Sequence, residues 1–450
     1  MRKKKALPVF LGPYEIAGYY RGLAQSLRAL GVDARFIEYS PYAYGLPSAA
    51  TEVPVLVRMC RFLERLKGAS SGLLLRMLFT PLLEVLRFVF FVTALLRYDA
   101  FIFGFGCSFL RGNWDLPILR LLGKKVVMNM AHGSELRPPY IDGARISKDG
   151  ALQPNPEEVK RLTVSQVFRM RRIEKNVRVI VGAPFSSTQF SKRRLINNFA
   201  LGIPCQQISI PPDKATALPP DEACDAARSR SERRVRILHS PSHPAAKGTY
   251  AIRQTIQNLR AKGHQIEFCE IQDRPNAEVV AAIQKCDFVV DQVYSDTPMA
   301  GFAAEAAWFS KPAVVGGYGF KYLKRFVPNG MWPPSQTCHP DDLEIAIETL
   351  IINAELREQL GRQAHEFVST QWPATEVAKR YLRLLEDDIP EEWWLDPAHV
   401  VYLHGGGLSE EKAKQNIQDL VKACGKESLQ LSHRPDLEKA FLEFANLSRD

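Results

Sequence analysis

The feature that most constrains this chain is an alternation of short apolar runs with helix-like segments, which occurs in two stretches. Apolar runs of about four to eight residues are typical of buried strands. Strands that alternate with helices form a parallel sheet that is covered by helices on both faces. The expected strands lie at 8–12, 34–39, 100–106, 125–133, 177–183 and 205–212 in the first stretch, and at 235–243, 265–271, 287–294 and 311–317 in the second.

The segment between the two stretches is polar, contains prolines and shows no periodicity, which predicts a linker. A chain of 450 residues is also long for one core. We therefore expect two doubly wound α/β domains that face each other across a cleft, with ligands beyond the carboxyl ends of the strands. The expected boundaries are 1–212 for the N-terminal domain, 213–234 for the linker, 235–372 for the C-terminal domain and 373–450 for a helical tail.

Proline at position 373 is expected to break the helical pattern near the start of the tail. The first part of the tail is expected to pack back on the N-terminal domain.

The charge balance favours an anionic partner. Lysine and arginine number 59 against 49 acidic residues, a net charge of +10, which suits nucleic acid, an acidic membrane or phosphorylated ligands. No recognised nucleic-acid module is present, so we expect no nucleic-acid partner. The eight cysteines form no CxxC pair and no zinc-ligand spacing. They predict reduced thiols in a cytoplasmic chain and no metal site.

The stretch "HSPSHPAAKGT" (239–249) joins an expected strand to an expected helix and places Lys247 and Gly248 at the helix start. Backbone N–H groups at a helix start attract anions, and a lysine adds a full positive charge. The P-loop pattern GxxxxGK[ST] is absent. Both an ordinary turn and a phosphate site fit these residues.

Glu305 lies near the start of an apolar helix that follows the strand ending near Asp291. One interpretation is a favourable interaction of an acid with the helix dipole. The other is a carboxylate that accepts hydrogen bonds from ligand hydroxyls, for which ribose is a natural partner.

Two further strand ends carry candidate residues. In "MAHGSELRPPY" (130–140), His132 has a structural role, binds sugar hydroxyls, or relays a proton from an acceptor. In "LGPYEIAGYY" (11–20), Gly12 and Gly18 either form a tight turn or let a ligand approach closely. The spacing is not GxGxxG, so a dinucleotide cofactor is not indicated.

The region 53–97 contains a basic amphipathic segment followed by an almost wholly apolar one. In the second, the polar residues Arg76, Thr80, Glu84 and Arg87 form one narrow stripe. A pair of core helices and a pair of membrane-surface helices both fit this pattern. The apolar runs are shorter than the ~20 residues that a spanning helix needs.

These stretches together resemble the bacterial GT-B glycosyltransferases of family four, over roughly residues 7–386. The segments that carry the resemblance are "GYYRGLAQSLRALGVDARF", "AHGSELR", "SPSHPAAKGTYAI" and "DFVVDQVYSDTPMAGFAAEAAWFSKPAVV". The resemblance implies two Rossmann-like domains, a retaining hexosyltransferase-type reaction that needs no metal, and a nucleotide-sugar donor as substrate with no further cofactor.

The resemblance also implies roles for residues. His132, Lys247 and Glu305 would be catalytic. The donor-binding residues would be Gly12, Gly18, His239, Ser240, Ser242, His243, Lys247, Gly248, Thr297, Met299, Ala300, Gly301, Phe302 and Glu305. The acceptor-binding residues would be Tyr19, His132, Glu135 and Arg137.

The chain departs from the family pattern at three places. Thr297 stands where the first glutamate of the family's pair is expected, Ala300 replaces a glycine, and Ser242 and His243 occupy the region of a common arginine.

We therefore expect a cytoplasmic enzyme, peripheral at the inner membrane surface, that glycosylates a saccharide or a lipid-linked acceptor in cell-surface polysaccharide or glycolipid synthesis. The alternative is a non-catalytic GT-B scaffold in a polysaccharide assembly complex.

Overall fold

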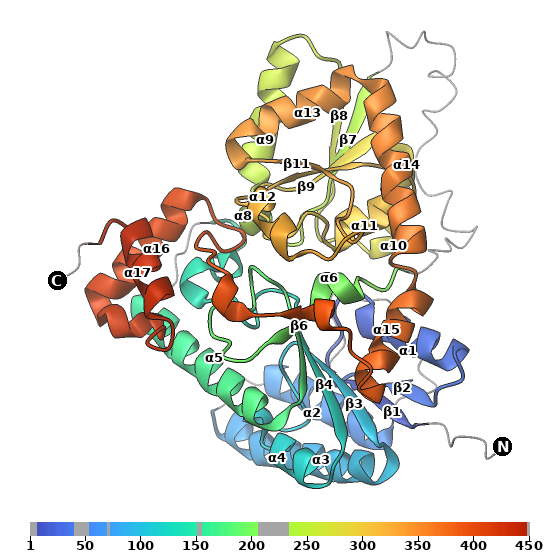
Figure 1. Ribbon diagram of the computed structural model, residues 1–450, viewed down its shortest axis with the longest axis vertical. Coiled ribbons are helices and arrows are strands. Elements are labelled where there is room, and N and C mark those ends of the chain that lie inside the picture. Colours follow the sequence, from blue (N-terminus) through green and yellow to red (C-terminus); the bar gives the residue numbers. More distant parts are fainter. Residues whose placement is uncertain (1–6, 40–53, 70–72, 151–154, 206–233, 448–450) are drawn as a thin grey trace. The chain divides into compact units, whose positions relative to one another are not determined.

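The computed structural model describes residues 7–39, 54–69, 73–150, 155–205 and 234–447 (Figure 1). The chain divides into two compact units. Unit 1 comprises Met1–Leu136, Val164–Pro204 and Ala374–His399; unit 2 comprises Arg137–Thr163, Cys205–Pro373 and Val400–Asp450. The expected linker 213–234 lies outside the described residues except for residue 234, and the expected strand 205–212 except for residue 205.

This division differs from the expected boundaries at two places. Arg137–Thr163, expected in the N-terminal domain, belongs to unit 2. Of the expected tail 373–450, Val400–Asp450 belongs to unit 2. Ala374–His399, the part expected to pack back on the N-terminal domain, belongs to unit 1. Each unit is therefore assembled from three separate stretches of chain.

Unit 1 contains a sheet of seven strands in the order β12-β6-β5-β4-β3-β1-β2, parallel except for β12. Its elements are β1 (Val9–Gly12), α1 (Tyr19–Ala29), β2 (Ala34–Phe36), α2 (Val55–Ala69), α3 (Leu73–Arg97), β3 (Ala100–Gly104), the 3-10 helix η2 (Arg111–Asn113), α4 (Leu116–Leu121), β4 (Lys125–Met130), α5 (Pro156–Asn176, which enters unit 1 at Val164), β5 (Val179–Gly182), β6 (Leu195–Asn197), α6 (Asn198–Leu201), α15 (Ala374–Glu386), η7 (Glu391–Trp393), β12 (Trp394–Leu395) and η8 (Pro397–His399).

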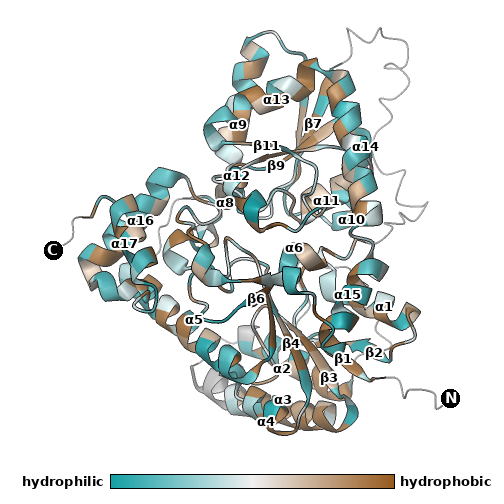
Figure 2. Cartoon of the chain, in the orientation of Figure 1, coloured by the Kyte–Doolittle hydropathy of each residue, from teal (hydrophilic) through white to brown (hydrophobic). Residues whose placement is uncertain are grey.

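Both faces of this sheet are buried. Neighbouring residues in a strand point to opposite sides of the sheet, so each strand contributes to two core clusters. In β1, Val9 and Leu11 join a core cluster with α1 and α15, whereas Phe10 joins a second cluster with α2, α3, α4 and α5. Figure 2 shows the apolar strands of this sheet and the apolar helix α3. A doubly covered parallel sheet is the arrangement that the sequence predicts.

Unit 2 contains a parallel sheet of five strands in the order β11-β10-β9-β7-β8. Its elements are η3 (Pro139–Ile141), η4 (Gly143–Arg145), β7 (Val235–His239), α8 (Pro244–Lys247), α9 (Thr249–Ala261), β8 (Ile266–Glu270), α10 (Asn276–Lys285), β9 (Phe288–Gln292), α11 (Gly301–Trp308), β10 (Ala313–Gly316), α12 (Phe320–Leu323), η5 (Lys324–Phe326), β11 (Gln336–Cys338), η6 (Pro340–Asp342), α13 (Leu343–Ile352), α14 (Ala354–Thr370), α16 (Glu410–Cys424), η9 (Lys426–Leu429) and α17 (Pro435–Phe444). The predicted fold class, two parallel α/β units, is confirmed by the two sheets.

The core of unit 2 follows the same rule. Ile237 of β7 and Val290 of β9 pack with apolar residues of α9 and α13 on one face of the sheet. The predicted break at Pro373 is also present, since α14 ends at Thr370 and α15 begins at Ala374.

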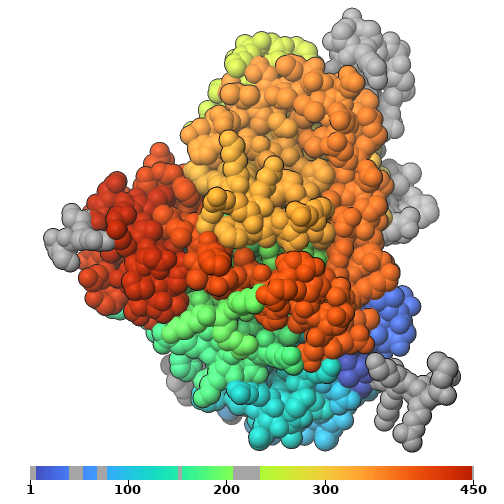
Figure 3. Space-filling view, viewed as in Figure 1, coloured from blue at the N-terminus to red at the C-terminus, as the bar shows by residue number. Residues whose placement is uncertain are grey.

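The C-terminal helices of unit 2 pack on Arg137–Thr163, the part of unit 2 that comes from the first half of the chain. The ring of Phe441 meets that of Tyr140 edge-on at 5.6 Å, and the Tyr140 hydroxyl donates to the carbonyl oxygen of Leu429 at 3.3 Å. Figure 3 shows α16 and α17 as one continuous body of side chains. Residues 400–447 are thus a structural part of unit 2.

Candidate functional site

The carboxyl edge of the unit 2 sheet brings the ends of β7 and β9 together, because these strands are neighbours. Lys247 ends the short helix α8, and Gly248 separates α8 from α9 with a φ of +72°. A Cβ at Gly248 would lie 2.7 Å from the side chain of Val293. Glycine is needed here for both its left-handed backbone and the close approach, and it sets the position of Lys247 beside β9.

Lys247 is held by the end of β9. Its ammonium nitrogen donates to Gln292 Oε1 at 2.8 Å and to Asp291 Oδ1 at 3.2 Å. The Asp291 side chain is 1% exposed and that of Lys247 is 20% exposed. No partner of Asp291 Oδ2 occurs among the described residues. A positive charge is thus fixed at the sheet edge, partly compensated by a buried carboxylate.

Glu305 lies in α11, which follows β9. Its carboxylate oxygens accept hydrogen bonds from Asn276 Nδ2 at 3.1 and 3.3 Å. Burial raises the pKa of Glu305 to about 7, against the effect of the Asn276 hydrogen bond, which lowers it. The carboxyl group therefore changes charge near neutral pH, and its ionised form is an acceptor for hydroxyl groups.

The loop before α11 is held by its own hydrogen bonds. The Thr297 hydroxyl donates to the carbonyl oxygen of Met299 at 3.4 Å, and the backbone N–H of Thr297 donates to Ser295 Oγ at 3.1 Å. Met299 is buried, Ala300 is the N-cap of α11, and Phe302 is half-buried. Gly301 is exposed and a Cβ there would meet nothing within 4 Å.

His239, which is predicted to bind the donor, is the last residue of β7 and precedes the joint to α8. This residue is fully buried, with Nδ1 2.8 Å from the Val290 carbonyl oxygen and Nε2 2.9 Å from Thr249 Oγ1. Both ring nitrogens have partners, so the His239 side chain connects the end of β7 to β9 and to the start of α9.

The other polar residues of this joint have different surroundings. Ser240 donates to the carbonyl oxygen of Ile271, His243 caps α8, and Ser242 is exposed. Of these three, Ser242 has the greatest access to solvent.

In unit 1, His132 follows β4 and meets the start of α1. Its Nε2 lies 2.7 Å from the Tyr20 hydroxyl, and its backbone N–H donates to Glu135 Oε1 at 2.6 Å. Burial lowers the pKa of His132 to about 4, so the imidazole is neutral at pH 7. A neutral imidazole can accept a hydrogen bond or a proton.

Tyr19, Gly12 and Gly18 each have a structural reason for their residue type. The Tyr19 hydroxyl lies 3.0 Å from that of Tyr381 in α15, and burial raises the pKa of Tyr19 to about 12. A Cβ at Gly12 would lie 2.2 Å from the carbonyl oxygen of Ile37. Gly18 caps α1 with a φ of +81° and open space around it. Gly12 is therefore required by packing, and Gly18 by its backbone.

Arg137, which is predicted to bind the acceptor with Tyr19, His132 and Glu135, lies at the start of a unit 2 segment. It belongs to unit 2, whereas His132 and Glu135 belong to unit 1. Its guanidinium donates to Asp142 Oδ1 at 3.0 Å and also to the Asp296 carboxylate. Both pairs are buried or nearly so. This places Arg137 as a buried cross-link between the segment after β4 and the loop after β9.

The sequence interpretation missed the partners of these residues: Tyr20, Asn276, Asp291, Gln292, Asp296 and the loop "HGGG" at 404–407. The polar pair at the end of an apolar strand could have indicated Asp291 and Gln292, since such residues lie at the ligand edge of a parallel sheet.

The "HGGG" loop at 404–407 makes close backbone contacts. Gly406 donates its N–H to Ile141 at 3.2 Å, and Gly407 donates to Tyr294 at 2.7 Å. A Cβ on Gly406 would lie 2.7 Å from Arg137 Cζ. A run of glycines is a signal of such close approach.

Among the described residues, no group of three or more histidine, cysteine, aspartate or glutamate side chains is placed to hold a metal ion.

No family model and no curated protein matches the chain. Among solved structures, it is similar to the Anabaena protein HepE in complex with UDP-glucose, with 12% identity over 85% of this chain and 100% of that chain and a TM-score of 0.45. It is similar to the glycosyltransferase SnogD from Streptomyces nogalater, with 13% identity, 85% and 100% coverage and a TM-score of 0.38. It is also similar to the catalytic domain of starch synthase IV from Arabidopsis thaliana bound to ADP and acarbose, with 10% identity, 85% and 99% coverage and a TM-score of 0.45. At identities and TM-scores this low, function has to be argued from the residues of the chain itself.

Proposed function

We propose that this chain is a GT-B glycosyltransferase that moves a sugar from a nucleotide-sugar donor to a hydroxyl group of an acceptor. The observation that supports this best is that Lys247 and Glu305 both follow strands that end at the same edge of the unit 2 sheet. A cation and a carboxylate that follow neighbouring parallel strands suit a ligand with phosphates at one end and sugar hydroxyls at the other.

In this proposal, the diphosphate lies against Lys247 and the starts of α9 and α11. The bond between the anomeric carbon and the phosphate oxygen breaks while the acceptor oxygen bonds to the same carbon with retention. The hydroxyl proton passes to the departing diphosphate. Lys247 and the helix starts stabilise the charge on the leaving group, a role that metal ions have in other enzymes. Glu305 accepts hydrogen bonds from the ribose.

The acceptor in this proposal binds in unit 1. His132 is neutral at pH 7 and can accept a hydrogen bond from the reacting hydroxyl, with Tyr20 holding the ring. The proposed acceptor is a saccharide or a lipid-linked saccharide, in the synthesis of a cell-surface polysaccharide or glycolipid on the cytoplasmic side of the membrane.

Calorimetric titration with UDP, GDP, ADP and CMP tests the donor site. We expect the wild-type protein to bind one nucleoside diphosphate, and Lys247→Ala to weaken that binding at least tenfold, since a charge-assisted hydrogen bond contributes about 1.5–3 kcal/mol. Asp291→Asn keeps the ammonium group and is the matched control, which should bind at least as well as the wild type. Binding that is equal in the wild type and Lys247→Ala would contradict the donor site.

A second candidate function is supported by the contacts of Lys247. Its ammonium group is already engaged by Asp291 and Gln292, and the Thr297 hydroxyl donates to the carbonyl oxygen of Met299. A non-catalytic scaffold in a polysaccharide assembly complex fits a sheet edge whose polar groups hydrogen-bond to one another. Absence of binding by all four nucleotides would favour the scaffold, whereas donor hydrolysis that is lost in Glu305→Gln would exclude it.

A further inference from the structure

Exposed apolar side chains gather on one side of unit 1. The helices α2, α3, α4 and α5 all pack on the same face of its sheet, through one core cluster. Of the twenty large apolar side chains that are exposed among the described residues, fifteen lie on or at the ends of these helices and of η2. We call this surface the α2–α5 face; its apolar residues are Val55, Met59, Phe62, Leu66, Leu82, Val85, Phe88, Val89, Leu96, Trp114, Ile118, Leu121, Leu122, Val164 and Phe168.

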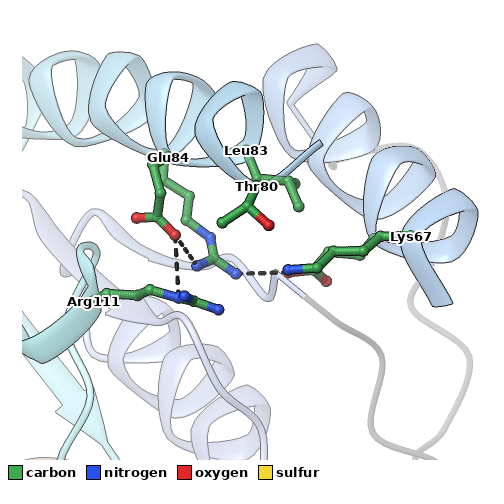
Figure 4. Close-up of a pocket in the computed structure, with 7 residues that line it drawn as sticks. Lys67, Thr80, Leu83, Glu84 and Arg111 are labelled. Carbon is green, nitrogen blue, oxygen red and sulfur yellow. Dashed lines mark hydrogen bonds and ion pairs between the residues drawn. The ribbon is translucent and has the colours of Figure 1, made fainter. Parts of the chain in front are cut away.

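Between positions 81 and 96, the two charged residues of helix α3, Glu84 and Arg87, are paired and half-buried. Arg87 is paired with Glu64 of α2 at 2.7 Å and with Glu84 at 3.0 Å, and Arg111 reaches Glu84 at 3.3 Å (Figure 4). This cluster lines a cavity of about 350 Å³ between α2 and α3. The exposed residues between positions 81 and 96 carry no charge; they are Pro81, Leu82, Val85, Phe88, Val89, Thr93 and Leu96.

The exposed charges of the α2–α5 face are all basic. Glu64 and Glu84 are half-buried in the cluster with Arg87, and Asp115 and Glu174 are buried. The exposed charged residues of α2, of α3 from Phe79, of η2, of α4 and of α5 from Val164 are Arg58, Arg65, Arg97, Arg111, Arg120, Arg171 and Lys175. An apolar surface with basic residues and without exposed acids complements an anionic lipid surface.

The geometry favours a helix that lies on a bilayer over one that crosses it. The uncharged runs of α3 are short, but the segment Phe79–Arg97 as a whole has a mean hydropathy of 1.9 and is long enough to span, with 28% of its residues buried. Its inner residues Phe90 and Phe91 are at most 4% exposed in the core of unit 1. Insertion of α3 across a membrane would remove these rings from the core and break the Arg87 pairs.

We propose that the α2–α5 face docks on an anionic lipid bilayer, with its apolar side chains at the boundary of headgroups and acyl chains and its arginines at lipid phosphates. This docking needs no nucleotide and no sugar transfer, so it stands or falls separately from the proposed function. It would hold unit 1 where a lipid-linked acceptor is presented.

Co-sedimentation of the full chain with vesicles tests this proposal, using phosphatidylcholine alone and an equimolar mixture with phosphatidylglycerol. We expect sedimentation with the anionic vesicles that weakens with salt. The double variant Val85→Glu/Phe88→Glu should lower the bound fraction about tenfold, because a charge on each exposed position opposes both burial and the anionic surface. The matched control Ile345→Glu/Ile352→Glu changes two side chains of unit 2 that are 63% and 69% exposed and should bind like the wild type.

Circular dichroism during heating checks that both double variants fold. A second variant, Arg58→Gln/Arg65→Gln, should lose affinity for the anionic vesicles only. The proposal is overturned if the wild type sediments with neither vesicle, or if Val85→Glu/Phe88→Glu binds like the control. It is also overturned if light scattering shows a dimer that the same variant dissociates while no vesicles are bound, since the face then joins two copies of the chain.

Discussion

The ammonium nitrogen of Lys247 lies 3.2 Å from Oδ1 of Asp291, a carboxylate that is 1% exposed at the end of β9. Phosphate binding by Lys247 would have to share or replace this ion pair. The pair therefore sets both the stability of the sheet edge and the charge that a ligand meets there.

Lys247→Ala should destabilise the fold by about 2 kcal/mol, because it leaves a buried carboxylate without its cation. Urea unfolding measures this change. The double variant Lys247→Ala/Asp291→Asn should recover most of the loss, since a neutral amide costs less to bury than an unpaired carboxylate. Equal stability of the wild type and Lys247→Ala would show that Asp291 does not depend on Lys247.

Glu305 should make the protein less stable as the pH rises from 4.5 to about 7. Its pKa is raised from 4.5 to about 7 in the folded state, so the folded state binds the proton more tightly than the unfolded one. The stabilisation is complete below pH 4.5 and is lost as the pH passes the folded pKa. Subtraction of the Glu305→Gln profile from that of the wild type, both from thermal unfolding between pH 4.5 and 8, should isolate this decline. A flat difference would contradict the raised pKa.

His132 should act on stability with the opposite sign. Its pKa is lowered from 6.5 to about 4, so the unfolded state binds the proton more tightly between these values. The contribution to stability is complete above pH 6.5 and falls as the pH drops toward 4. Replacement by asparagine should remove this dependence, while Tyr20→Phe keeps the imidazole and should retain it. Unfolding curves that run parallel for the wild type and His132→Asn across this range would argue against the buried neutral form.

Gly405→Ala should destabilise unit 2 by about 2 kcal/mol or more, because overpacking against backbone cannot relax cheaply. A Cβ at this position would lie 1.9 Å from the carbonyl oxygen of Ile141. Gly330→Ala is the control: its φ of +75° matches the +70° of Gly405, and a Cβ there would meet nothing within 4 Å. The Gly330→Ala variant should lose only the free energy of backbone strain, about 1 kcal/mol. Thermal unfolding compares the two, and equal shifts would mean that the "HGGG" loop can move away from Ile141.

The sequence by itself determined the two parallel sheets and the position of most of their strands. Runs such as 100–106 and 288–290 are apolar because both faces of each strand are buried, and that pattern is visible without coordinates. The break at Pro373 was equally predictable from the chemistry of the proline ring. The short strands β6, β11 and β12 were not predicted, since their two or three residues are not part of a longer apolar run.

Only the tertiary structure decided which polar residues are partners. Arg137 is five residues from His132 in the sequence, yet it belongs to the other unit and pairs with Asp296. Spacing along the chain records local neighbours, whereas these contacts arise where distant segments meet. The two interpretations of the 53–97 region show the same limit. The apolar residues of α3 divide between a buried face and an exposed face, and hydrophobicity alone cannot tell which of them the sheet covers.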